Sequence, residues 1–349
     1  ELLDAYGVRQ NRRWYPLRQA AAALKLFSNV SYILQHMLHF LPTYRLLPLE
    51  VDFTAAATEA LEFTCRILVA SARNLLRTAR DLGIPIPEEA PAPEQFADDL
   101  PDGRLPPDRS SQKVASPEET VVYLATAFLN LAEEAKFIHV ARSGAASSYA
   151  ELIPDPISEE RLRSLEQKFH NLQSLYDTHI SDSNVESLDE RLPVLRGQVT
   201  VIFHLLETAT AFTHFCERHV LSFAPKRRKG SEDIVEASEL LRVLFEYSLA
   251  FASRFILATR ALCHEMLKRY AIQGRITVQV PRYRGFHVRP STLIARIVTH
   301  YGSEVTMELD GEPYNAGVTL DLFRANETLN ARKKRRLAEE AHALLGAGA

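Results

Sequence analysis

The chain has 349 residues, of which 46% are hydrophobic and 24% are charged. This length and composition are typical of a folded protein with room for two domains. The formal net charge of -3 argues against nucleic-acid binding as the main task, although short basic clusters occur at 226–229 and 332–336. We therefore expect no nucleic-acid partner.

The cysteines and the most apolar segment favour a soluble protein of the reducing cytoplasm. Cys65, Cys216 and Cys263 stand singly among apolar neighbours, in neither a disulfide framework nor a zinc spacing, so we expect buried thiols and a reducing cytoplasm. The most apolar window, about 240–267, contains Arg242, Glu246, Arg254 and Arg260. These charges predict a buried helix of a soluble bundle and no membrane span.

Two long helices are predicted first, over 14–41 and about 50–82. Both carry apolar residues at helical spacing, and the second ends at Gly83, before a series of prolines. Residues 84–117 are rich in proline and acidic residues, which predicts an extended surface loop. An ordered strap packed across the helices is the alternative.

Further helices are predicted over 117–142, 158–179, 189–222 and 231–273. The last has two neighbouring apolar stripes, so we expect it to lie centrally in the bundle. Residues 1–273 are therefore predicted to form a multi-helix bundle, and the protein is expected to be mainly α.

After Gly274 the pattern changes from helical to alternating. The segment 275–280 reads as a strand, 289–302 as a helix and 303–316 as a hairpin turning at Asp310 and Gly311. A short helix over 318–325 and a charged helix over 330–345 complete the chain. Residues 274–349 are thus predicted to form a small α+β domain.

The bundle offers little sign of a metal site. A carboxylate-bridged metal pair requires Glu-x-x-His on two helices, a spacing that the chain lacks. His36 with His39, and His214 with Glu217, share helix faces without forming a paired set. No nucleophile elbow, phosphate-binding loop or dinucleotide fingerprint is present either, so we expect no metal and no cofactor.

His287 is the strongest candidate for chemistry. It precedes the predicted helix and is followed by Arg289 and Pro290, so it would cap the helix with proline in the first turn. The free backbone N–H groups of that end, beginning near Ser291, and the Arg289 guanidinium would favour an anion. A neutral imidazole placed there can accept a phosphoryl group.

Residues 275–330 resemble the histidine-containing phosphocarrier family, HPr, of the phosphoenolpyruvate-dependent phosphotransferase system. The family signature, Gly-Leu-His-Ala-Arg-Pro-Ala, is matched here by the residues of 285–291, Gly-Phe-His-Val-Arg-Pro-Ser. The resemblance implies that His287 is the phosphoryl acceptor and that Arg289 is its charge partner. Ser291, at the helix N-terminus, is also expected to stabilise the phosphoryl group. It also implies an Enzyme I-like donor, and partner-facing roles for Phe286, Leu320 and Phe323.

Two departures from the family stand out. The regulatory serine of many members has no clear counterpart, because Thr319 is the nearest hydroxyl to its expected place. The family's fourth strand, which lies centrally in its sheet, is also missing, since 323–340 lacks β-branched alternation. Either the remaining strands pair directly in a reduced sheet, or the helical domain covers the vacancy.

These features lead to two functional hypotheses. The first is a carrier or regulator, rather than a turnover enzyme, that is phosphorylated on His287 by an Enzyme I-like phosphotransferase or binds another regulatory protein. The second is a non-catalytic interaction protein in which a degenerate HPr-like module serves for docking.

Overall fold

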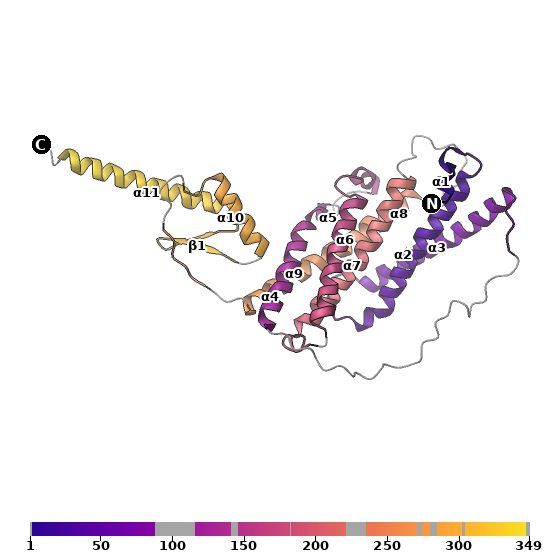
Figure 1. Ribbon diagram of the computed structural model, residues 1–349, viewed down its shortest axis with the longest axis horizontal. Helices are drawn as coiled ribbons and strands as arrows, with labels where there is room; N and C mark the ends of the chain where they lie inside the picture. The colour runs from indigo at the N-terminus through magenta and orange to yellow at the C-terminus, as the bar shows by residue number, and fades with distance from the viewer. Residues whose placement is uncertain are drawn as a thin grey trace. The chain divides into compact units, whose positions relative to one another are not determined.

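The computed structural model describes residues 2–87, 116–140, 146–181, 183–220, 235–270, 274–279, 285–301 and 304–346 (Figure 1). The protein is mainly helical with a small antiparallel sheet near the C-terminus, which confirms the predicted fold class. Contacts divide it into two compact units: Glu1–Pro117 with Glu134–Arg260, and Glu118–Glu133 with Ala261–Ala349. The division after Arg260 differs from the predicted one at 273, because the second unit includes the end of a bundle helix.

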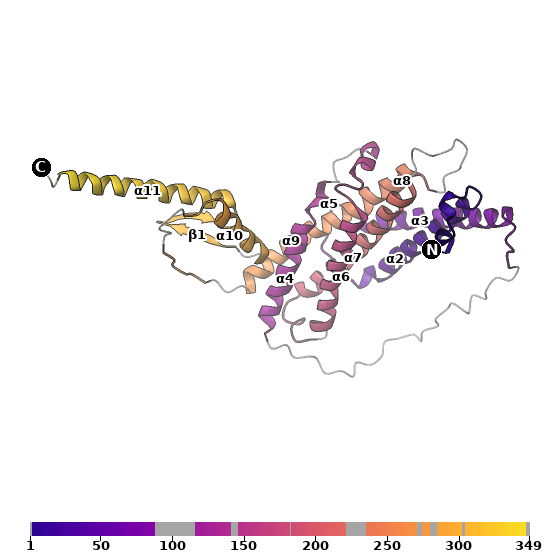
Figure 2. The same ribbon diagram turned by 45° about the horizontal axis from the view of Figure 1, so that its top comes forward.

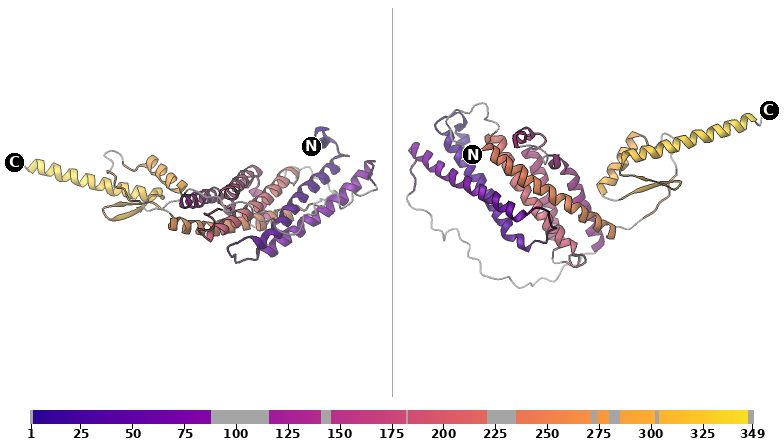
Figure 3. Two further views of the ribbon diagram at one scale, coloured as in Figure 1. Left: turned by 60° about the horizontal axis from the view of Figure 1, so that its bottom comes forward. Right: turned by 180° about the vertical axis from the view of Figure 1, so that it is seen from behind.

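The first unit begins with the short elements α1 (Leu2–Ala5) and η1 (Val8–Gln10), followed by two long helices. These are α2 (Tyr15–Phe40) and α3 (Phe53–Asp81), joined through η2 (Leu41–Thr43) and lying side by side in Figure 3. Asp52 caps α3, because its side chain accepts a hydrogen bond from the Ala55 N–H at 3.0 Å. Gly83, at φ 76°, ends it. Both predicted helices are confirmed.

The middle of the chain continues as helices. They are α4 (Pro117–Glu134), α5 (Lys136–Val140), the 3-10 helix η5 (Ala146–Leu152), α6 (Glu159–His179), α7 (Arg191–Phe215), α8 (Ala237–Arg242) and α9 (Ala250–Tyr270). The helix predicted over 117–142 is interrupted at Ala135, and the one predicted from 231 begins at Ala237. Most of the predicted loop 84–117 lies outside the described residues.

Two π-helical segments, η6 (Cys216–Val220) and η8 (Val243–Leu249), were not predicted. The first extends α7, and the second joins α8 to α9. A π-helix adds a residue to the turn without changing the apolar pattern greatly, so hydrophobic periodicity does not reveal it.

Aromatic side chains form the centre of the first unit, where α2 packs against α3 and α7 (Figure 2). The ring of Phe27 lies 6.3 Å from that of Phe63, 6.0 Å from that of Phe212 and 5.3 Å from that of Phe215. Below about 7 Å such rings contact one another in edge-on or tilted arrangements. These rings tie three helices that are distant in sequence into one core.

The segment Arg191–Val220 is long and apolar enough to cross a membrane by length and composition. However, 72% of its most apolar window is buried inside the protein, as expected for the core helix of a bundle. Cys216 and Cys263 are buried as predicted, and burial raises the pKa of the Cys216 thiol to about 12. The prediction was wrong for Cys65, which is exposed.

The C-terminal part of the second unit contains α10 (Val288–Tyr301), β1 (Thr306–Leu309), β2 (Glu312–Asn315) and α11 (Thr319–Gly346). The strands form the predicted hairpin, with Asp310 at φ 53° and Gly311 at φ 89° in the turn. Two positive φ values in a two-residue loop are typical of a type I′ turn, which matches the twist of the strands. The sheet is two-stranded in the described part of the chain.

Two predictions for this region were wrong. Residues 274–279 have no regular secondary structure, although a strand was predicted there. The two predicted terminal helices are one helix, α11, because neither glycine nor proline interrupts it between Thr319 and Leu345. The place of the family's fourth strand in the sequence is therefore occupied by helix.

Candidate functional site

The loop before α10 is shaped by a close approach to α11. Gly285 has φ 49°, and a Cβ at this position would lie 2.2 Å from the Oδ1 atom of Asn326. That distance is far below van der Waals contact, and a positive φ is unfavourable for other residues. Glycine is thus favoured here for its backbone conformation, and any side chain at this position would have to displace the Asn326 amide.

The backbone of the next residue, Phe286, is held on both sides of its Cα atom. The backbone N–H of Phe286 donates to Asn326 Oδ1 at 2.8 Å, and its carbonyl oxygen accepts a hydrogen bond from Ser291 Oγ, also at 2.8 Å. Ser291 and Asn326 are both buried. Because buried polar groups are costly to leave unpaired, these two side chains fix the chain direction immediately before His287.

His287 occupies the N-cap position of α10. Its carbonyl oxygen accepts the backbone N–H of Ser291 at 3.1 Å, and the helix begins at Val288. Pro290 lies in the first turn, where its missing N–H costs nothing. The N–H groups of Val288 and Arg289 precede the first intrahelical bond, at the positive end of the helix dipole, and no described residue accepts a backbone hydrogen bond from either.

The side chains of His287 and Arg289 are exposed, and the described residues supply neither with a hydrogen bond or an ion pair. The predicted histidine and arginine are therefore both accessible at one helix end. Ser291 differs, because it is buried and its N–H and hydroxyl are both engaged within the loop. Its observed contacts position the His287 loop.

The predicted partner-facing residues are accessible to different degrees. Leu320 is 67% exposed, whereas Phe286 and Phe323 are half-buried. Leu320 and Phe323 lie on α11 within two turns of Asn326, the residue that contacts the His287 loop. The exposed apolar residues of α10 are Val288, Leu293, Ile297 and Tyr301.

Asn326 holds the loop before His287 and was not among the site residues predicted from the sequence. It lies 40 positions after Phe286, in a helical stretch of mixed composition. An asparagine in a helix is ordinarily exposed, so only its partner in the folded chain distinguishes it.

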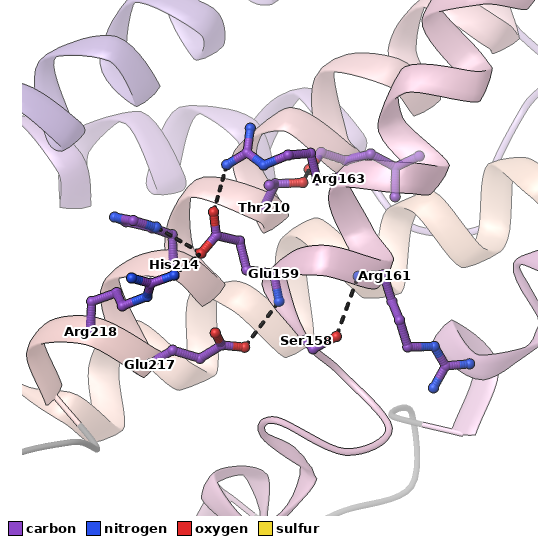
Figure 4. A network of polar contacts seen from close by, with 9 residues as sticks. Ser158, Glu159, Arg161, Arg163, Thr210, His214, Glu217 and Arg218 are labelled. Carbon is purple, nitrogen blue, oxygen red and sulfur yellow. Dashed lines mark hydrogen bonds and ion pairs between the residues drawn. The ribbon is translucent and has the colours of Figure 1, made fainter.

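The first unit carries a polar network at the N-terminus of α6 (Figure 4). Glu159 accepts hydrogen bonds from Arg163 Nη2 and His214 Nδ1, each at 2.8 Å, and its backbone N–H donates to Glu217 Oε1 at 3.0 Å. Burial alone would raise the pKa of Glu159, but the hydrogen bonds from Arg163 and His214 outweigh it and lower this pKa. The network fastens α6 to the end of α7 and to η6.

Histidine and carboxylate side chains, which are possible metal ligands, also occur elsewhere in the described part of the first unit. Among the described residues, no group of three or more histidine, cysteine, aspartate or glutamate side chains could hold a metal ion. The ring of His36 lies 5.5 Å from the ring of His204, measured between their centroids.

Comparison of the chain with protein-family models, curated proteins and solved structures gives no significant match. The resemblance to HPr therefore rests on the motif at 285–291 and on the order of the elements that follow it.

Proposed function

We propose that the protein is a cytoplasmic phosphocarrier, or a regulator controlled by phosphorylation, that accepts a phosphoryl group on His287. The observation that supports this best is the exposed imidazole at the N-cap of α10, with the exposed guanidinium of Arg289 two residues on. Both groups stand beside backbone N–H groups that have no partner within the helix.

The proposed step is a direct transfer. An unprotonated ring nitrogen of His287 attacks the phosphorus of the donor, a P–N bond to His287 forms, and the bond between phosphorus and the donor's leaving group breaks. The leaving group keeps the electron pair of that bond. Arg289 and the helix N-terminus stabilise the charge on the phosphoryl oxygens, which requires no enclosed pocket.

An Enzyme I-like phosphotransferase is the donor that the motif suggests. We would incubate the full chain with Enzyme I and radiolabelled phosphoenolpyruvate, and compare it with His287→Ala and with His300→Ala. His300 is an exposed histidine of the same helix and serves as the matched control. We expect acid-labile label on the unchanged chain and on His300→Ala, and none on His287→Ala.

A small phosphoryl donor such as phosphoramidate tests whether His287 can be phosphorylated without a protein donor. Label from phosphoramidate without label from Enzyme I would support a phosphorylatable His287 that has a different donor. Absence of His287-dependent label from both donors would reject the proposal.

A second candidate function is docking without phosphoryl transfer, and the reduced sheet favours it. The described part of the sheet has two strands, where the family implied by the motif has four. In this case His287→Ala would bind the physiological partner as tightly as the unchanged chain does. A loss of partner binding in His287→Ala would argue against pure docking.

A further inference from the structure

The two outer edges of the β1–β2 hairpin differ. The Ala316 N–H donates to the Val305 carbonyl oxygen at 2.9 Å, so this facing pair is a hydrogen-bonded one. Bonded and non-bonded pairs alternate along an antiparallel ladder. With the observed register, Thr306 and Asn315 form a non-bonded pair, and so do Glu308 and Pro313. The backbone groups of these four residues therefore point away from the hairpin.

The outer edge of β2 is closed to another strand. Pro313 has no N–H to offer, and the N–H of Asn315 donates to Asp321 Oδ2 at 3.2 Å. Proline and occupied N–H groups are common means by which proteins prevent pairing at a sheet edge.

The outer edge of β1 has no such protection. Thr306 and Glu308 present their N–H and carbonyl groups there, and no backbone hydrogen bond reaches this edge from the described residues. The side chains alternate along β1, since Met307 and Leu309 are half-buried while Thr306 and Glu308 are exposed. A strand that pairs here would need apolar residues on one face and polar residues on the other.

The chain itself carries such a segment. In 275–279, Ile276 and Val278 alternate with Arg275, Thr277 and Gln279, yet Ile276 is 86% and Val278 is 70% exposed. The segment also already contacts β1 by a side chain, because Arg275 Nη2 donates to Glu308 Oε2 at 2.6 Å. β-branched residues in alternation favour a strand, but a strand forms only when its backbone finds a partner.

An antiparallel register that places Arg275 opposite Glu308 matches both faces. The polar pairs would be Arg275 with Glu308, Thr277 with Thr306 and Gln279 with Glu304. The apolar pairs would be Ile276 with Met307 and Val278 with Val305. Opposite charges and apolar residues would thus meet directly across the two strands.

This register favours a segment from another copy of the chain. Within one copy, α10 connects the segment to β1, and such a strand-helix-strand crossover sets the two strands parallel. A parallel segment held at Arg275 and Glu308 would pair with β1 over two residues before it runs past Leu309, whereas an antiparallel one pairs with β1 over three and continues along Val305 and Glu304.

We propose that the open edge of β1 is a pairing site for residues 275–279 of a second copy of this chain. Two copies exchanging these segments form a symmetric dimer in which each β1 gains an antiparallel neighbour. The dimer does not depend on phosphorylation of His287.

The first test is the dissociation constant of the full-chain dimer, measured by analytical ultracentrifugation. We expect Ile276→Asp with Val278→Asp to raise it by at least about tenfold, since both apolar cross-strand pairs are lost at each of two sites. Both side chains are exposed, so the change should leave the fold of one copy intact.

Leu337→Asp with Val69→Asp, at exposed positions elsewhere, is the matched control and should leave the dissociation constant unchanged. A chain that is monomeric up to its solubility limit, or a dimer equally affected by both double variants, would overturn the proposal.

The second test identifies the two segments that meet. Thr277→Cys and Thr306→Cys are prepared separately in a Cys65→Ser background, mixed and oxidised. Facing residues of an antiparallel pair have Cα atoms about 5.5 Å apart, which suits a disulfide. We expect a disulfide that joins one variant to the other. If a chain carrying both cysteines forms the bond only within itself, the segment pairs with its own β1 and the proposal is wrong.

Discussion

The side chain of Asn326 on α11 accepts a hydrogen bond at 2.8 Å from the backbone N–H of Phe286, the residue before His287. Replacing Asn326 with alanine would leave this N–H without its acceptor in a part-buried position. We expect a loss of about 1–3 kcal/mol of unfolding free energy. Asn330→Ala, one turn further along α11, is the control. Equal urea unfolding curves for the two variants would show that the Asn326 contact contributes nothing.

Gly285→Ala should also destabilise the second unit, by about 1–3 kcal/mol, because alanine is strained at φ 49° and its Cβ meets Asn326 Oδ1. Gly274→Ala is the matched control, since a Cβ there has no atom within 4 Å and the φ value is ordinary. In a double-mutant cycle, Gly285→Ala should cost less when Asn326 is already alanine. If the two losses of unfolding free energy are strictly additive, the Cβ atom introduced by Gly285→Ala does not collide with Asn326 in solution.

Arg289→Ala is expected to slow phosphoryl transfer to His287 by about tenfold or more, since one charge-assisted contact to the phosphoryl oxygens is lost. Arg296→Ala removes an exposed arginine from the same helix and should leave the rate unchanged. The rate of acid-labile labelling is the measurement, and circular dichroism shows whether α10 is intact. An unchanged rate in Arg289→Ala would remove this residue from the site.

Glu159→Gln should give a pH-dependent loss of stability. The pKa of Glu159 is lower in the folded chain than its ordinary value of 4.5. Its carboxylate therefore stabilises the fold fully above that ordinary value, and this contribution is lost as the pH falls through the lower folded value. The difference in urea stability between the unchanged chain and Glu159→Gln should be largest near neutral pH and should shrink in acid.

The fluorescence of Trp14, the single tryptophan and part of the first unit, can follow this unfolding. Glu160→Gln alters an exposed neighbour and is the control. A difference between Glu159→Gln and the unchanged chain that is constant from neutral to acid pH would contradict the assignment.

The elements that the sequence predicted well are those with local causes. Gly83 ends α3 by adopting a positive φ, and Ser158 caps α6 by accepting the Arg161 N–H at 3.3 Å. The Asp310–Gly311 turn is equally local. Such signals depend on neighbours within a few residues, so they can be read before the fold is known.

The features that were missed have distant causes. The segment 275–279 has the alternation of a strand, but strand formation depends on a backbone partner elsewhere in the chain. Asn326 and Ser291 hold the His287 loop through contacts that no local pattern encodes. The sequence thus identified the candidate acceptor and its arginine, whereas the side chains that position them required the fold.

Pro313 also limits how large an assembly of this chain can become. A hairpin with two receptive edges can add a neighbour on each side, and each addition creates a new edge, which is the route to fibres. Here one side lacks a donor at Pro313 and has the Asn315 N–H already occupied by Asp321. Growth by strand addition is therefore blocked on the β2 side, so the hairpin can gain neighbouring strands only from the β1 side.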